Sequence, residues 1–250
     1  MVDCKKALDE AGGEIEKAAE ILRKKGIAKA AKRGEREATE GIIKLAVNSS
    51  ASEGYILEVN SETDFVARNE KFQKITDDIL ALLIEKKPEN LNELLSLPFG
   101  ESNAGDALSH LSGTIGEKIS IARFGIITGG TVAWYSHAGG RIGVLVALDK
   151  PGKNELAYDI AMQAAAANPR YLRPEDVPSA EIEKEKEIYR EQLKTEGKSG
   201  DMVEKILVGK INKYFEEVCL LNQEYIKDDK KKIKDILGDA KIEKFIRYSL

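Results

Sequence analysis

The sequence is poor in the residues that build metal centres, disulfide frameworks and nucleophilic active sites. Its 250 residues include two cysteines, Cys4 and Cys219, and two histidines, His110 and His137. The cysteines are too far apart for a disulfide framework or a CxxC zinc site, and neither histidine has the spacing of an HExxH motif. We therefore expect no metal and no cofactor, and a reducing, cytoplasmic location.

Long apolar runs and an excess of one charge are also missing. No run approaches the roughly 18–20 apolar residues that span a bilayer, and no basic-then-apolar leader opens the chain. The 39 basic and 43 acidic residues give a formal net charge of −4, which offers no basic surface to nucleic acid. The sequence predicts a soluble protein that binds neither membranes nor nucleic acid directly.

The sequence motifs of common enzymes are absent as well. There is no GxSxG, GxxxxGK[ST] or GxGxxG, and the glycines of HAGGRIGV (137–144) lead into a strand and not into a helix that could hold phosphate. A paired-carboxylate site stays open, because 43 acidic residues always offer pairs. We expect no enzymatic activity; a small-molecule enzyme with a cleft between repeated halves of the chain is kept as an alternative.

Strand patterns fill the middle of the chain, and helical periodicity fills the rest. Apolar, β-branched or aromatic runs predict strands at 41–47, 55–59, 119–127, 131–137, 142–148 and 244–250. Gly129–Gly130 and Gly139–Gly140 have the spacing of hairpin turns, so antiparallel pairing is expected. Because strands and helices are segregated, the predicted fold class is α+β, with Cys4, Cys219 and Trp134 expected in the core.

Two helical segments lie outside this pattern. The stretch 2–26 predicts two helices separated by Gly12–Gly13, the second ending at Gly26. The stretch 179–217 predicts two highly charged helices with apolar stripes, joined by a short turn. Such a pair forms an antiparallel hairpin that can project from the body of the protein.

A weak internal repeat singles out one turn. Residues 54–83 and 141–166 each read as an apolar strand, a polar turn and an amphipathic helix. Only the first turn, NSETDFVARN (60–69), carries an acidic residue, Asp64, beside an apolar pair, Phe65 and Val66. Phe65 either packs under the next helix or enters a partner, and the spacing of Ser61 and Asp64 fits a capping box.

Several stretches occur in a characteristic order: MVDCKKALDEAGGEIEKAAEILRKKGIAKAAKR, ILEVNSETDFVARNEKF, YSHAGGRIGVLVAL, IAMQAAAANPRYLRPEDV and FIRYSL. Together they resemble the elongation factor Ts family, the guanine-nucleotide exchange factors of elongation factor Tu, over nearly the whole chain. The resemblance implies a ubiquitin-associated-like N-terminal module, a two-part core of antiparallel sheets with helices, and an inserted coiled-coil hairpin. Members usually carry one more helix before the start of this sequence.

This resemblance gives the expected division of the chain. The units are an N-terminal helical module without its first helix (1–27), a linker (28–40), a first core subdomain (41–140), a second core subdomain (141–178 and 218–250) and the coiled-coil hairpin (179–217).

The resemblance also implies a partner and a site. The residues Thr63, Asp64, Phe65 and Val66 match the family motif that enters the GTPase domain of elongation factor Tu, where the acid and the aromatic ring disturb the magnesium and phosphate contacts of GDP. Further implied partner contacts are Ile115, Gly116, His137, Met1 and Val2. A homodimer or a 2:2 complex with the GTPase stays open. The alternative is an adaptor that binds a partner without any exchange activity.

Overall fold

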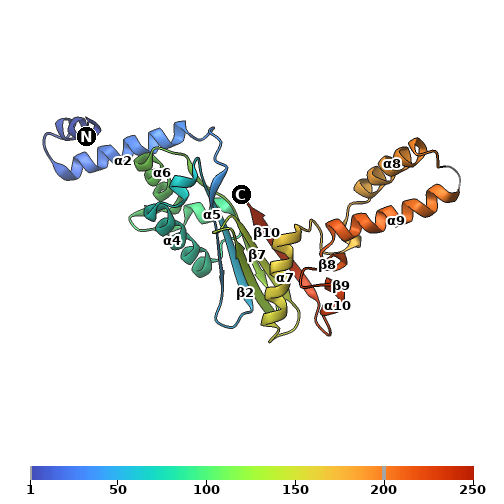
Figure 1. Cartoon of the computed structure of the whole chain (residues 1–250). Helices are drawn as coiled ribbons and strands as arrows, with labels where there is room; N and C mark the ends of the chain where they lie inside the picture. Colours follow the sequence, from blue (N-terminus) through green and yellow to red (C-terminus); the bar gives the residue numbers. More distant parts are fainter. Residues whose placement is uncertain (1, 199–200) are drawn as a thin grey trace.

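The computed structural model describes residues 2–198 and 201–250, which form an elongated molecule (Figure 1). Two N-terminal helices lie at one end, a mixed core lies in the middle, and a helical hairpin projects at the other end. The helices are α1 (Val2–Glu10), α2 (Ile15–Lys32), α3 (Asp64–Ala67), α4 (Glu70–Lys86), α5 (Leu91–Ser96), α6 (Ala104–Ile115), α7 (Asn154–Ala167), α8 (Ser179–Thr195), α9 (Asp201–Val218) and α10 (Ile233–Ile236). The strands are β1 (Glu40–Val47), β2 (Glu53–Ser61), β3 (Pro98–Phe99), β4 (Ser102–Asn103), β5 (Ile119–Thr128), β6 (Thr131–His137), β7 (Ile142–Leu148), β8 (Glu224–Tyr225), β9 (Asp228–Lys232) and β10 (Ile242–Ser249).

Two three-stranded antiparallel sheets form the centre of the core, with strand orders β1-β2-β5 and β10-β7-β6. They pack against each other through a buried apolar layer. Its members are Ile43, Ile56, Ile127, Val132, Leu145 and Ala147. Gly143 lets the sheets approach, because a Cβ on this residue would lie 2.5 Å from Cγ2 of Ile43. The predicted α+β class is confirmed.

Helices cover the outer face of each sheet. The side chains of β2 that point away from the second sheet pack on α4 and α6, in a cluster that includes Tyr55, Leu57, Val59, Phe72, Ile79, Leu83, Leu108 and Leu111. The corresponding side chains of β7 pack on α7, in a cluster that includes Val144, Val146, Leu148, Ala157, Ile160, Ala161 and Ala164. The repeat seen in the sequence therefore corresponds to a central strand followed by a covering helix in each sheet.

The expected hairpin at Gly129–Gly130 is wrong. Strand β5 pairs with β2 and strand β6 pairs with β7, so the chain crosses from one sheet to the other at these glycines. A Cβ on Gly130 would lie 2.4 Å from the carbonyl oxygen of Asp149, which leaves room only for glycine. Strand β6 belongs to the second sheet, although it was expected in the first core subdomain (41–140). If the core is divided by its sheets, the boundary between the two subdomains falls at Gly129–Gly130.

The expected end of the second helix at Gly26 is also wrong. Helix α2 continues to Lys32, so the first residues of the expected linker are helical. Gly26 instead lies where α2 crosses α6: a Cβ on Gly113 of α6 would be 2.7 Å from the Cα of Gly26. Glycine on both helices thus permits a close crossing.

The expected burial is correct for Cys219 but not for two other residues. Cys4 is exposed on α1, and Trp134 is 43% exposed on the edge strand β6. No helix in the described part of the chain is long and apolar enough to cross a membrane.

The hairpin consists of α8 and α9, with Leu193, Leu207 and Ile211 buried along it. A polar cluster fixes its base. The carboxylate of Glu181 on α8 accepts hydrogen bonds from the hydroxyl of Tyr171 (2.8 Å), from Arg170 (3.0 Å) and from the hydroxyl of Tyr214 on α9. These bonds lower the pKa of Glu181, with the bond from Tyr214 as the largest cause.

Candidate protein-binding site

The segment 61–68, which we call the Phe65 turn, connects β2 to α4 and contains the single helical turn α3. The side chain of Phe65 is 80% exposed, whereas the next two residues, Val66 and Ala67, are only 7% and 8% exposed. Packing of Phe65 under the following helix, one of the two interpretations of the sequence, is therefore wrong. Val66 and Ala67 anchor the turn in the core while the aromatic ring points into solvent.

The cap of this helical turn differs from the expected capping box. Thr63 is the N-cap, and its Oγ1 accepts a hydrogen bond from the backbone N–H of Val66 at 3.4 Å. Ser61 instead donates its hydroxyl to the carbonyl oxygen of Thr63 at 2.9 Å. Asp64 occupies the first helical position, where a negative charge is favourable, and its carboxylate binds Arg68 at 2.8 Å.

Two glutamates connect the Phe65 turn to the loop after α6. The carboxylate of Glu117 accepts hydrogen bonds from the backbone N–H of Thr63 (3.0 Å) and from its hydroxyl (2.8 Å). The carboxylate of Glu62 accepts one from the backbone N–H of Lys118 (2.6 Å) and binds Arg36 (3.2 Å). The hydrogen bond from Lys118, followed by the hydrogen bond and the charge of Arg36, lowers the pKa of Glu62.

The segment after α2 joins the same network. The ammonium group of Lys118 donates to the carbonyl oxygens of Gly34 and Arg36, both at 2.8 Å. Arg33 donates to the carbonyl oxygen of Ser112 at 3.0 Å. Three stretches distant in sequence (33–36, 61–65 and 112–118) therefore meet at the base of the Phe65 turn. Neither Glu62 nor Glu117 was among the residues expected at the site, although Glu62 lies inside NSETDFVARN and Glu117 follows Ile115 and Gly116 directly.

Ile115 and Gly116, two of the implied partner contacts, end helix α6 beside this network. Ile115 is partly buried against the core of the first sheet. Gly116 adopts a φ of 96° as the left-handed C-cap of α6, and its N–H binds the carbonyl oxygen of Ser112 at 2.9 Å. The structure thus gives both residues a local structural role and places them one and two residues before Glu117.

His137 lies at the end of β6, before the turn that leads into β7. Its ring stacks on Tyr135 with centroids 6.0 Å apart, and its Nδ1 is 3.2 Å from the hydroxyl of Tyr135. The carbonyl oxygen of Gly140 in the same turn accepts from the N–H of Ile43 at 2.8 Å, which holds the turn against β1. The hydrogen bond to Glu40 and then the charge of Glu40 raise the pKa of Arg141, and the charge of Asp64 adds a smaller effect in the same direction.

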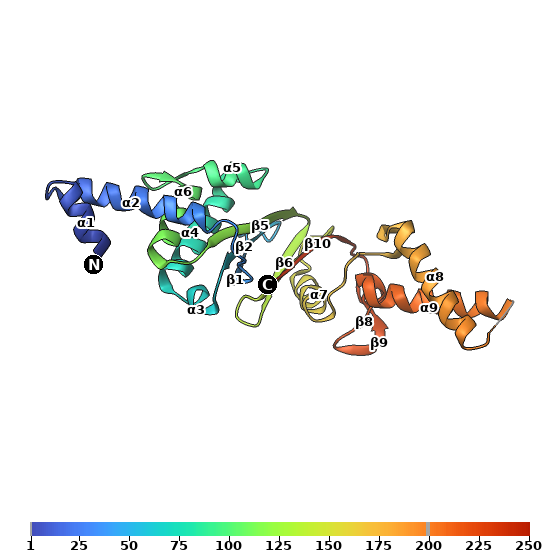
Figure 2. The ribbon, with the colours of Figure 1, turned by 90° about the horizontal axis from the view of Figure 1, so that it is seen from above.

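The other implied contacts are not brought together with the Phe65 turn. Figure 2 shows α1 at the far end of α2, well away from α3. Val2 is 69% exposed there. Met1 lies outside the described residues.

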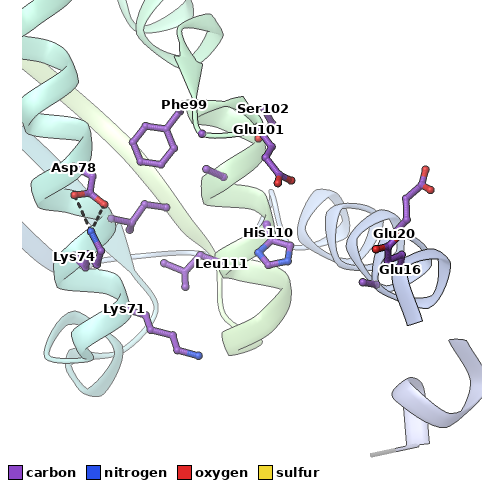
Figure 3. Close-up of a pocket in the computed structure, with 14 residues that line it drawn as sticks. Glu16, Glu20, Lys71, Lys74, Asp78, Phe99, Glu101, Ser102, His110 and Leu111 are labelled. Atoms are coloured by element: carbon purple, nitrogen blue, oxygen red, sulfur yellow. Dashed lines mark hydrogen bonds and ion pairs between the residues drawn. The ribbon is translucent and has the colours of Figure 1, made fainter. Parts of the chain in front are cut away.

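A groove of about 730 Å³ lies elsewhere, between α2, α4, α6 and the β3–β4 hairpin (Figure 3). Ile75, Leu111 and Phe99 supply its apolar surface, and Glu16 of α2 faces it from the opposite side. Lys74 at its edge is already bound to Asp78 at 2.8 Å. In residues 2–198 and 201–250 no group of three or more His, Cys, Asp or Glu side chains could hold a metal ion.

A second groove, of about 630 Å³, lies between the halves of the core, along β5 and β10. An enzyme with a cleft between the repeated halves would use this place. Its Arg123 is bound by the buried carboxylate of Glu58 at 2.7 Å and lies over the ring of Tyr248 at 4.1 Å. The guanidinium is thus engaged in holding the two sheets together, which does not favour the enzyme alternative.

Comparison with known proteins assigns the chain to a family. The sequence model described as elongation factor TS matches residues 62–250. The chain is 44% identical to elongation factor Ts of Chlorobium phaeobacteroides, over all of this chain and 93% of the relative. It is 45% identical to elongation factor Ts of Nitratiruptor sp., over all of this chain and 88% of the relative, and 42% identical to that of Clostridium botulinum, over 99% and 87%. The chain belongs to the elongation factor Ts family.

Proposed function

We propose that the protein is a guanine-nucleotide exchange factor that binds elongation factor Tu with GDP and accelerates the release of GDP, so that GTP can rebind. Family membership supports a role in translation elongation. The exposure of Phe65 on an anchored turn carries the finer proposal, because an aromatic ring left in solvent on a fixed backbone is available to a partner. Such a factor breaks no covalent bond and acts in the cytoplasm.

The mechanism is a coupling between two binding equilibria. An exchange factor and GDP each weaken the other's hold on the GTPase by the same free energy. This requires a group that contacts the GTPase best in a state that binds GDP and magnesium poorly. Burial of the Phe65 ring in an apolar slot of the GTPase contributes about 1.5–3 kcal/mol to that state.

Asp64 adds an electrostatic contribution. Its ion pair with Arg68 is a surface pair, with side-chain exposures of 40% and 77%, and such pairs are worth about 0–1 kcal/mol. The carboxylate can therefore leave Arg68 at little cost. Its negative charge then approaches a site already crowded with phosphate oxygens and magnesium.

The remaining partner contacts form part of the proposal. Thr63 and Val66 fix the backbone on either side of the inserted pair. Ile115, Gly116 and His137 extend the contact surface around the Phe65 turn. Val2, with Met1, would contact the GTPase at a separate place, because α1 lies at the far end of the molecule.

One measurement separates this function from its alternative. Elongation factor Tu loaded with mantGDP is mixed with excess GDP, with and without this protein, and the fluorescence decay is followed. We expect release to accelerate by at least tenfold. An adaptor would bind the GTPase without changing the release rate, and that outcome would refute the proposal.

A further inference from the structure

The Phe65 turn has too few internal contacts to fix its own conformation. Helix α3 is four residues long, and an isolated helical turn is unstable because nucleation fixes several dihedral angles for one hydrogen bond. Phe65 is exposed and contributes no packing to the free protein. The direction in which Asp64 and Phe65 point is therefore set by the anchors on either side of them.

On the C-terminal side the anchors are the buried Val66 and Ala67. On the N-terminal side the buried Ser61 donates its hydroxyl to the carbonyl oxygen of Thr63, and the anchor from outside the turn is Glu117. Its two carboxylate oxygens accept one hydrogen bond each from Thr63: Oε2 from the backbone N–H at 3.0 Å and Oε1 from the hydroxyl at 2.8 Å. Hydrogen bonds to an ionised acceptor are about twice as strong as neutral ones, and two of them together fix both the backbone and the side chain of the N-cap residue.

Glu117 is itself held in place by its neighbours. The left-handed conformation of Gly116 turns the chain at the end of α6. The buried hydroxyl of Ser112 then donates to the carbonyl oxygen of Glu117 at 2.5 Å, and the next residue, Lys118, donates its N–H to Glu62 at 2.6 Å. The carboxylate therefore extends from a loop that is fixed at both ends.

We propose that Glu117 is the positioning residue of the exchange site: it orients the Asp64–Phe65 pair through Thr63 and does not itself contact the GTPase. This inference rests on the proposed exchange function. It predicts a specific kinetic signature. Loss of the anchor lowers the maximal rate of GDP release, because the pair enters the GTPase in the wrong orientation, whereas the concentration of factor needed for half-maximal effect changes little.

The experiment compares Glu117→Ala with Glu117→Gln, and with Glu89→Ala as a control that removes an exposed acid from a loop at the other side of the same core. Two quantities are measured. The first is hydrogen exchange of the Val66, Ala67 and Arg68 amides in the free protein, since these three form the hydrogen bonds of the turn. The second is mantGDP release from elongation factor Tu over a range of factor concentrations.

For Glu117→Ala we expect at least tenfold faster exchange of the three amides and an at least tenfold lower maximal release rate, with a half-saturating concentration within about threefold of the unmodified protein. Glu117→Gln keeps an acceptor for the N–H of Thr63 and restores most of both quantities; Glu89→Ala changes neither. If Glu117→Ala does not fold, Thr63→Val tests the same anchor through the amides of Ala67 and Arg68. It keeps the backbone bond to Glu117 and removes the hydroxyl, which also caps the Val66 amide, so Val66 is left out of that comparison.

Two results would overturn the inference. One is slower release with unchanged amide exchange, which would make Glu117 a direct partner contact. The other is faster amide exchange throughout the first sheet, which would make it an ordinary stabilising residue. If the unmodified protein does not accelerate GDP release at all, the proposed function fails, whereas the amide exchange still decides whether Glu117 orders the turn.

Discussion

Replacement of Phe65 by alanine should separate exchange activity from folding. The ring is 80% exposed, so its removal should change the free energy of unfolding by no more than about 0.5 kcal/mol, as for other surface substitutions. In the proposed complex, burial of the same ring would contribute about 1.5–3 kcal/mol. Since about 1.4 kcal/mol corresponds to a factor of ten, GDP release stimulated by Phe65→Ala should be slower by about tenfold or more.

Val66→Ala provides the matched comparison. Val66 is only 7% exposed and belongs to the core cluster of the first sheet, so its truncation should destabilise the free protein by about 1–3 kcal/mol. The two neighbouring substitutions should therefore differ in stability: Phe65→Ala loses exchange and keeps its melting temperature, whereas Val66→Ala lowers the melting temperature. The assays are mantGDP release and thermal unfolding by calorimetry. A large drop in melting temperature for Phe65→Ala, or unchanged exchange, would show that the ring does not act on a partner.

Three further predictions concern the surroundings of the site. Gly113→Ala should destabilise the protein by about 1–3 kcal/mol, because the added Cβ would meet the backbone of Gly26. The same substitution should loosen α2, which amide exchange measures. As a control, Gly209→Ala on α9, where a Cβ would meet nothing within 4 Å, should be neutral or slightly stabilising. Replacement of residues 184–210 by a Gly-Ser link should leave the core folded and most exchange activity intact, because the deletion keeps Glu181 and Tyr214 at the base of the hairpin. Unfolding of the core in this variant would show that the core needs the hairpin for its stability. Glu62→Gln should destabilise the protein at neutral pH but not in acid. The pKa of Glu62 is lowered from 4.5 in the folded state, so the stability that its carboxylate contributes is present above pH 4.5 and is lost as the pH falls below that value. A difference in the free energy of unfolding that stays constant across the pH range would contradict this assignment.

The sequence predicted the elements of this fold better than their connections. Apolar, β-branched and aromatic runs identified the strands of both sheets, because such side chains suit buried positions in a pleated sheet. The pair Gly129–Gly130, which suggested a hairpin, lies where the chain crosses from one sheet to the other. Gly26, which suggested the end of a helix, lies where α2 crosses α6. Glycine signals freedom of the backbone or close approach of another chain segment, and only the fold decides between them.

The exposed pair of the candidate site could be predicted from the sequence, but the glutamates that hold it in place could not. Asp64 and Phe65 stood out because an apolar residue in a polar turn needs a reason, and the family resemblance gave one. Glu62 and Glu117 gave no such signal, because a single acid among 43 acidic residues is unremarkable until the fold brings it to its donors. Contacts between residues 54 positions apart, such as Thr63 and Glu117, are set by tertiary packing and leave no local pattern.

The two halves of the core show how such a site can be added without altering the sheet beneath it. In the second half, β7 reaches α7 through a short turn, and α7 begins at Asn154 with no side-chain cap. In the first half, the corresponding connection contains an additional helical turn with its own N-cap at Thr63, and α4 then begins with a separate cap at Asn69. Both central strands are buried on both faces along nearly their whole length, so the connection is where the halves differ. An exposed aromatic residue in such a connection is useful only if its direction is fixed, and a one-turn helix cannot fix it alone. If Asp64 and Phe65 act as proposed, the polar contacts from the loop after α6 belong to the functional difference between the halves as much as these two residues do.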